Sequence, residues 1–202
     1  MTRPRGRPRE FDREVALEAA MQLFWEKGYD RTSLQDLLDA LEISNSSFYQ
    51  AFKSKEDLFE EVLSYYFSFV GKPRLAILRE GKSVPTTLNK YFNHLIDASL
   101  EQNGPTGCLI VNTAVSLKPQ DQRIARRIQE VVTASYERLE NTLLDLLLKG
   151  KERDELRPDL DLRTAARMLA AVAYGLHVMT KGLQDVEVLR DVAAGAIESV
   201  TK

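Results

Sequence analysis

Between positions 44 and 50 the chain carries a run of uncharged polar side chains that are suited to contacting nucleobases. Glutamine and asparagine amides pair with adenine through two hydrogen bonds, and serine hydroxyls both donate and accept. No arginine lies in the run, so a readout dominated by guanine is not expected. The candidate residues are Ser44, Asn45, Ser46, Ser47, Tyr49 and Gln50.

The sequence predicts that a short helix presents this run. Ser44 is a good N-cap, and Phe48 and Phe52 lie one helical turn apart, so they form an apolar face opposite the polar one. Before it, Thr32 or Ser33 caps another short helix, whose leucines at 34, 37, 38 and 41 have the spacing of a half-buried helix. Two short helices joined by a tight turn, the second with a polar face, are typical of a helix-turn-helix that enters a major groove. An ordinary hairpin in an all-helical core is the alternative.

The first nine residues form a basic arm that contains four arginines and no acidic residue. Proline and glycine disfavour a helix there, so we expect an extended segment. Its core, Pro4-Arg5-Gly6-Arg7-Pro8, has the pattern of an AT-hook, in which Arg5 and Arg7 enter a narrow A·T-rich minor groove. A basic tail that is merely attracted to phosphates is the alternative.

Overall composition excludes several classes of protein. The 202 residues carry a formal charge of −2, so a uniformly basic nucleic-acid binder is excluded and any basic surface must be local. A single cysteine excludes an internal disulfide and fits a reducing cytosol. No signal peptide and no membrane-spanning stretch is predicted. We therefore expect a cytoplasmic protein.

Residues 10 to about 60 resemble the N-terminal domain of the TetR family of transcriptional regulators. Many positions match in fixed register: Ala19-Ala20, Leu23-Phe24, Gly28-Tyr29, Thr32-Ser33, Ile43-Ser44, Phe48-Tyr49, Phe52, Lys55-Glu56 and Leu58. One departure is Glu42, which stands where the family usually has glycine. Either Glu42 adopts a positive φ, or the turn has a different shape.

The resemblance implies roles for the individual residues of this domain. Asn45, Ser46, Ser47 and Gln50 would face base edges, while Tyr49 and Lys55 would hold phosphates. Thr32 and Ser33 would offer hydroxyl and backbone N–H groups to another phosphate. Lys53 is a further candidate for a backbone contact.

The rest of the chain predicts an all-α protein of about nine helices. A helix that begins at Lys55 is expected to end at Gly71-Lys72-Pro73, which gives a basic arm at 1–9, a DNA-binding domain at 10–70 and a ligand-binding and dimerisation domain at 71–202. Further helices are expected at about 85–102, 108–115, 120–148, 162–182 and 186–200. The last two are rich in apolar and small residues, and the resemblance implies that residues 162–200 form a homodimer interface.

A small-molecule site within the C-terminal helices is also implied by the resemblance. Its candidate lining residues would be equally at home in an ordinary core: Phe92, Ile96, Cys108, Asn112, Val115, Met168, Tyr174 and His177. Cys108 is expected in the first turn of a helix, where the macrodipole favours a thiolate, and the resemblance implies that it could sense electrophiles or oxidants. An inert buried thiol is the alternative.

These patterns predict a DNA-binding protein, and the resemblance implies a homodimeric regulator, a repressor that a small-molecule effector releases from its operator. A thiol-based sensor acting through Cys108 and an architectural minor-groove binder led by the arm are the alternatives. The two histidines, His94 and His177, have no ligand cluster at metal-binding spacing, so no metal site is predicted. No cofactor and no enzymatic activity are predicted, since motifs for nucleophiles and phosphate loops are missing from the sequence.

Overall fold

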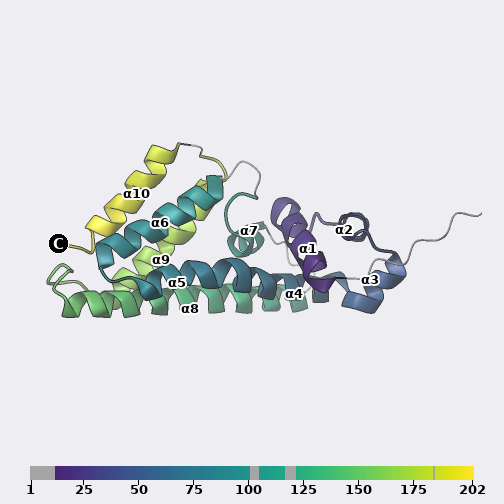
Figure 1. The fold of residues 1–202 in the computed structure, drawn as a ribbon, viewed down its shortest axis with the longest axis horizontal. Helices are drawn as coiled ribbons and strands as arrows, with labels where there is room; N and C mark the ends of the chain where they lie inside the picture. Colours follow the sequence, from purple (N-terminus) through teal and green to yellow (C-terminus); the bar gives the residue numbers. More distant parts are fainter. Residues whose placement is uncertain (1–11, 101–104, 117–121, 184) are drawn as a thin grey trace, which may run out of the picture.

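A computed structural model describes residues 12–100, 105–116, 122–183 and 185–202, and these residues form an all-helical fold. Figure 1 shows α1, α2 and α3 gathered at one end, α6, α9 and α10 at the other, and α8 running beneath most of the length. Within the described ranges no helix is long and apolar enough to cross a membrane. The helices are α1 (Arg13–Lys27), α2 (Leu34–Leu41), α3 (Asn45–Phe52), α4 (Lys55–Tyr66), the π-helix η1 (Phe67–Gly71), α5 (Lys72–Glu80), α6 (Val84–Leu100), α7 (Leu109–Ser116), α8 (Gln122–Glu152), α9 (Leu162–Met179) and α10 (Val186–Glu198).

Side-chain caps fix the starts of the first four helices. Asp12 accepts hydrogen bonds from two backbone N–H groups of α1, and Ser33 forms a capping box with Asp36 at the start of α2. Ser44 and Ser54 each accept from the backbone N–H three residues further on. The predicted helix starts at Ser33 and Ser44 are confirmed.

The turn between α2 and α3 closes on a left-handed residue. Glu42 has φ 53° and ψ 38°, and its N–H donates to the carbonyl oxygens of Leu38 and Asp39. Of the two possibilities left by the sequence, Glu42 therefore adopts the positive φ, and an L-residue does so at a cost of about 1–2 kcal/mol.

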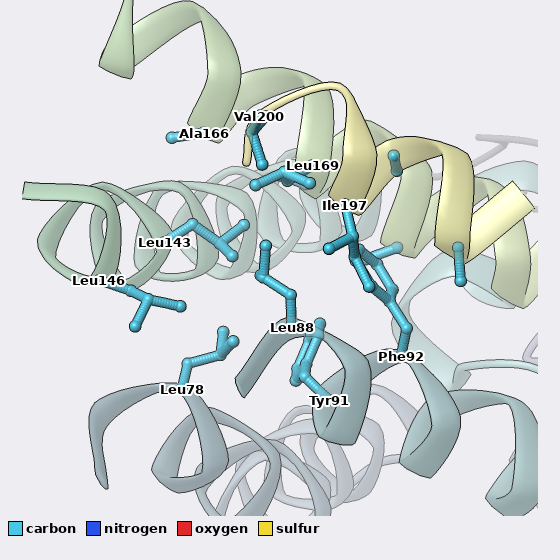
Figure 2. Packing of buried hydrophobic residues seen from close by; sticks show 14 of the residues in the cluster. Leu78, Leu88, Tyr91, Phe92, Leu143, Leu146, Ala166, Leu169, Ile197 and Val200 are labelled. Carbon is cyan, nitrogen blue, oxygen red and sulfur yellow. The ribbon is translucent and has the colours of Figure 1, made fainter. Parts of the chain in front are cut away.

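The hydrophobic interior has two centres. The first packs α1 to α4 around Phe24, Phe48 and Phe59, and it also includes Leu109 of α7 and Ile128 of α8. The second lies between α5, α6, α8, α9 and α10, where Figure 2 shows side chains of these helices meeting in one interior. The N-terminal core is therefore completed by residues from the C-terminal half of the chain.

A continuous helical rod joins the two halves of the molecule. The backbone stays helical from α4 through η1 into α5, so the prediction that the helix ends at Gly71-Lys72-Pro73 is wrong. Pro73 lacks a backbone N–H, and the π-helical turn η1 directly before it accommodates this break in the regular hydrogen-bond pattern, with the Lys72 N–H donating to the Phe67 carbonyl oxygen five residues back. Gly71 leaves room for an aromatic ring, since a Cβ there would lie 2.7 Å from Cδ2 of Phe67.

Candidate nucleic-acid interface and buried cavity

The polar run forms one exposed face of α3. Asn45, Ser46, Ser47 and Gln50 are exposed, and the Tyr49 side chain is 51% exposed. On the opposite face Phe48 and Phe52 are buried against the core, with exposed fractions of 0% and 1%. The structure thus places these candidate base- and phosphate-contacting residues together on a helix face that is locked in place from behind.

The serines at the start of α3 hold one another. The Ser44 hydroxyl oxygen lies 3.0 Å from that of Ser46 and 2.9 Å from that of Ser47, and it accepts a hydrogen bond from the Ser47 N–H. Ser44 is therefore engaged in capping, while the hydroxyls of Ser46 and Ser47 are oriented before any ligand arrives.

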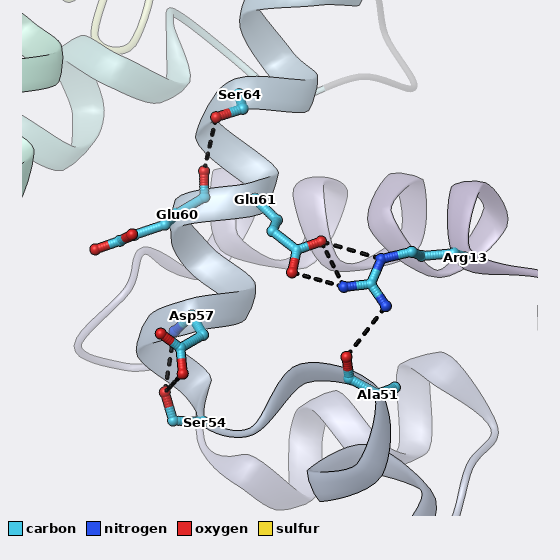
Figure 3. A network of polar contacts seen from close by, with 7 residues as sticks. All are labelled: Arg13, Ala51, Ser54, Asp57, Glu60, Glu61 and Ser64. Atoms are coloured by element: carbon cyan, nitrogen blue, oxygen red, sulfur yellow. Dashed lines mark hydrogen bonds and ion pairs between the residues drawn. The ribbon is translucent and has the colours of Figure 1, made fainter.

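Arg13 of α1 fixes the far end of α3. Its guanidinium makes a bidentate ion pair with Glu61 of α4, with a shortest distance of 2.6 Å, and it donates to the carbonyl oxygen of Ala51 at 3.1 Å. It also lies 4.9 Å from the centre of the Phe52 ring. Figure 3 shows this arginine bridging three helices. The sequence offers no local signal for it, because its partners lie 38 and 48 residues away.

The two phosphate-contact candidates before α2, Thr32 and Ser33, use their donors for hydrogen bonds within the protein. Thr32 is 1% exposed, and its hydroxyl and N–H donate to the carbonyl oxygens of Gly28 and Tyr29. A phosphate contact by Thr32 is therefore not supported, because both of its donors are used inside the protein. Ser33 is exposed, but its hydroxyl and N–H both donate to Asp36.

The two lysine candidates after α3 are placed differently from each other. Lys53 is exposed and has φ 63°, so it projects from the turn between α3 and α4. Lys55 is half-buried, with its ammonium 4.2 Å from the centre of the Tyr29 ring, and burial lowers its pKa. A phosphate contact by Lys55 would have to compete with this ring. Arg5 and Arg7 lie outside the described residues.

A partly open pocket of about 70 Å³, called the cavity below, lies where the rod meets α6, α8 and α9. Of the eight predicted ligand residues, it is lined by Cys108, Tyr174 and His177. The other lining residues are Tyr66, Phe67, Gly71, Arg74, Leu75, Tyr91, Leu95, Ile110, Ser135, Leu139 and Ala173.

The other five predicted ligand residues do not line this cavity. Phe92 and Ile96 are closed in the core, with exposed fractions of 1% and 0%, because they lie on the α6 face that packs toward other helices. Val115 is 76% exposed and Met168 is 37% exposed, and the Met168 sulfur accepts a hydrogen bond from the Ser199 hydroxyl. Asn112 instead donates to the carbonyl oxygen of Thr106 in the preceding loop.

Cys108 belongs to a short chain of hydrogen-bonded side chains in the lining of the cavity. The Tyr66 hydroxyl donates to the Cys108 sulfur at 3.2 Å, and Nη1 of Arg74 donates to the same hydroxyl at 3.4 Å. Burial raises the pKa of Tyr66 well above its usual value, so the phenol is neutral at physiological pH. The chain connects the last residue of α4, the first turn of α5 and the residue before α7, and neither Tyr66 nor Arg74 was found from the sequence.

Close backbone packing brings His177 beside this chain. Gly107 has φ 80°, and a Cβ there would lie 2.8 Å from the carbonyl oxygen of His177, so only glycine lets the loop approach α9. Burial, with a smaller effect from Arg74, lowers the pKa of His177 to about 3. The imidazole is thus neutral at pH 7, and its Nδ1 has no hydrogen-bond partner among the described residues.

Comparison with known proteins assigns both halves of the chain. The model of bacterial regulatory proteins of the tetR family matches residues 16–62, and that of the tetracyclin repressor-like C-terminal domain matches residues 85–196. The HTH-type transcriptional repressor ComR of Escherichia coli K12 is 33% identical over 190 residues, covering 94% of this chain and 89% of ComR. The repressor BdcR of the same strain is 29% identical over 96% of this chain and 92% of its own length.

Solved structures agree over nearly the whole length. A cysteine mutant of the TetR family transcriptional regulator CifR, in complex with 26-base-pair operator DNA, superimposes with a TM-score of 0.84 at 30% identity. That match covers 96% of this chain and 99% of CifR. Reduced NemR of Escherichia coli shares the fold with a TM-score of 0.80 at 20% identity.

Proposed function

The chain belongs to the TetR family of bacterial regulatory proteins and is a DNA-binding transcriptional regulator; from this premise we propose that it is a cytoplasmic repressor, which a small molecule bound in the cavity releases from its operator. The observation that carries the proposal is the exposed polar face of α3, held rigidly from behind by Phe48 and Phe52. A single short reading helix binds weakly, so the repressor must present two of them.

A second copy of the chain would supply the other reading helix. The outer faces of α9 and α10 expose apolar side chains, with Val178 48%, Val188 40%, Met168 37% and Val192 36% exposed. Burying this face against its own copy removes the apolar area from water and relates the two α3 helices by a two-fold axis. Such a pair reads successive major grooves about 34–36 Å apart. Arg5 and Arg7 would add contacts in the flanking minor grooves.

The proposed release mechanism uses the rod and α7. The cavity touches the end of α4 through Tyr66 and the start of the α7 segment through Cys108, and these two residues are hydrogen-bonded. Leu109 and Ile110 of α7 also pack in the N-terminal core. An effector that prefers a wider cavity would move α4 and α7 together and change the spacing of the two reading helices. A coupling of about 1–3 kcal/mol is typical for such a switch.

Variants that separate base contacts from phosphate contacts test the proposed DNA-binding face of α3. DNA bound by the wild type is first selected from a random pool, and affinities are then measured by fluorescence anisotropy. Gln50→Ala should change the preferred sequence, whereas Tyr49→Phe combined with Lys55→Ala should weaken binding about equally on all sequences. Gln35→Ala on the exposed face of α2 is the matched control. Unchanged preference in Gln50→Ala would contradict the proposed reading face.

Deletion of residues 1–9 tests the architectural alternative. The proposed repressor should lose affinity and A·T preference at the flanks but keep its operator choice. If the deletion alone abolishes sequence selectivity, the arm and not α3 is the specific reader.

A second candidate function is thiol sensing by Cys108, favoured by its place in the cavity wall and its contact with Tyr66. An α,β-unsaturated carbonyl would form a C–S bond with Sγ while the alkene electron pair moves to the α-carbon, which takes up the thiol proton. Because Cys108 is the only cysteine, N-ethylmaleimide is a clean probe. Release of DNA by this reagent should disappear in Cys108→Ser, and unchanged release would exclude the thiol mechanism.

A further inference from the structure

Arg74 brings an unbalanced positive charge to the cavity. Its one hydrogen bond in the described part of the chain goes to the neutral Tyr66 hydroxyl, and no described carboxylate lies within ion-pair distance. None of the lining residues is an aspartate or glutamate. A partly buried cation without a counter-charge is unfavourable, so an anion that entered the cavity would be stabilised.

The tyrosines and the histidine around the cavity are neutral at physiological pH. Burial raises the pKa values of Tyr66, Tyr91 and Tyr174, and burial lowers the pKa of His177. Arg74 lines the same cavity as Tyr66, Tyr91 and His177, and its charge acts on the pKa of all three. Nδ1 of His177, a residue that is 5% exposed, and Oγ of Ser135 are buried without hydrogen-bond partners in the described residues.

The lining also has an apolar part, here called the leucine wall, and the space is small. Leu75, Leu95, Leu139 and Ala173 supply these apolar side chains. The cavity of about 70 Å³ is far smaller than the roughly 300–1,000 Å³ typical of sites for drug-sized ligands. Its occupant should therefore be short, with an anionic end and an apolar end.

We propose that the cavity binds a short-chain monocarboxylate, whose oxygens accept hydrogen bonds from the guanidinium of Arg74 and whose alkyl chain lies against the leucine wall. The inference deepens the proposed function, since it rests on this cavity being the effector site. His177 and Ser135 offer further hydrogen bonds to the bound anion. A carboxylate at Arg74 also takes over the donor that now reaches Tyr66, so it acts directly on the contact between Tyr66 and Cys108.

The test compares acids with amides of the same shape. Thermal unfolding of the full chain, without DNA, is followed at constant ionic strength with acetate, propionate or butyrate and with acetamide, propionamide or butyramide. The carboxylates should raise Tm and the amides should not. Arg74→Gln should weaken carboxylate binding about 10-fold or more, the scale of a lost charge-assisted hydrogen bond. Arg79→Gln, at an exposed position of the same helix, should bind as the wild type does.

Three outcomes would overturn the proposal: no carboxylate raises Tm, the amides act equally, or Arg74→Gln keeps the full response. If Arg74→Gln does not fold, Arg74→Lys takes its place; it keeps the charge but loses the planar fork and must still bind more weakly. Operator release is measured separately with the same compounds. Carboxylate binding without release contradicts the proposed function alone, whereas release by an uncharged compound in both wild type and Arg74→Gln contradicts only the carboxylate assignment.

Discussion

The proposed reading face, which is the exposed polar side of α3 from Asn45 to Gln50, and the cavity differ in how the sequence forms them. The reading face comes from consecutive residues, and its helix is capped by Ser44 within the same segment. The cavity is lined by residues of the rod, α6, α7, α8 and α9, together with Cys108 just before α7. Short-range structure is encoded in neighbouring residues, and a pocket between helices depends on the packing of the whole domain.

The two regions also differ in whether their polar groups have hydrogen-bond partners. The serines of α3 bond to one another, and the aromatic rings behind them pack closely, with 5.7 Å between the ring centres of Phe48 and Phe52. The cavity keeps an unbalanced Arg74 and an unpartnered Nδ1 of His177 among the described residues. Side chains that already have hydrogen-bond partners keep a fixed arrangement. Buried polar groups without partners mark a place where a ligand can supply the missing hydrogen bonds.

The largest effect should come from removing the support behind the reading face. Phe48→Ala should lower the free energy of unfolding by about 3–5 kcal/mol, because Phe48 is fully buried. Its exposed neighbour provides the control: Tyr49→Ala should change stability by less than about 1 kcal/mol while weakening DNA binding. Urea unfolding measures the first quantity and anisotropy the second. Equal losses of stability in the two variants would show that α3 is not held from behind.

The next effect should appear at the cavity and depend on pH. The folded-state pKa of His177 is about 3, against about 6.5 when unfolded, so below pH 6.5 the unfolded chain takes up a proton that the folded chain does not. The contribution of His177 to the free energy of unfolding is fully present above pH 6.5 and is lost as the pH falls toward 3. The free energy of unfolding should therefore be about 2 kcal/mol lower at pH 5 than at pH 7. Urea unfolding at both pH values measures the difference.

His177→Leu should remove this contribution, and His94→Leu, at an exposed position of α6, should retain it. The same slope in wild type and His177→Leu would mean that the imidazole is not buried in its neutral form.

A smaller effect should distinguish the strained turn before the reading helix from the regular helix beside it. The Glu42→Gly variant should be more stable than the Glu42→Ala variant by about 1 kcal/mol, because only glycine adopts φ 53° without strain. In the last turn of α2 the sign should reverse, with Ala40→Gly costing up to about 1 kcal/mol. Both are read from urea midpoints. A preference for alanine at position 42 would mean that the turn relaxes to another conformation.

The smallest effect should come from the bridge at the end of α3. Arg13→Ala should destabilise the protein by about 0.5–1 kcal/mol, since its ion pair with Glu61 is exposed to solvent although the geometry is bidentate. Lys27→Ala, which removes a single-contact surface pair with Asp36, should cost less. If the double variant Arg13→Ala with Glu61→Ala costs the sum of the two single changes, the pair contributes no coupling energy.

The sequence predicted the caps of α2 and α3 and the exposed polar side of α3, because caps, apolar spacing and polar residue types all act over a few positions. It did not predict Arg13 as a clamp, since its contacts join residues far apart in the chain. For the cavity it found Cys108, Tyr174 and His177 but not Tyr66 or Arg74. Those two lie along a rod that the sequence predicted to end at Gly71-Lys72-Pro73, and a π-helical turn followed by proline in a first turn leaves no clear signal of continuity.

The unbroken rod has a practical consequence for building chimaeras from this regulator. A fusion point at Gly71 or Pro73 would cut through a helix about 40 Å long and separate Tyr66 from Arg74. Gly81 is the first extended residue after the rod, and a Cβ there would lie only 2.0 Å from Oγ1 of Thr87. A hybrid that exchanges sensing halves between relatives should therefore be joined just beyond Gly81, with that glycine retained.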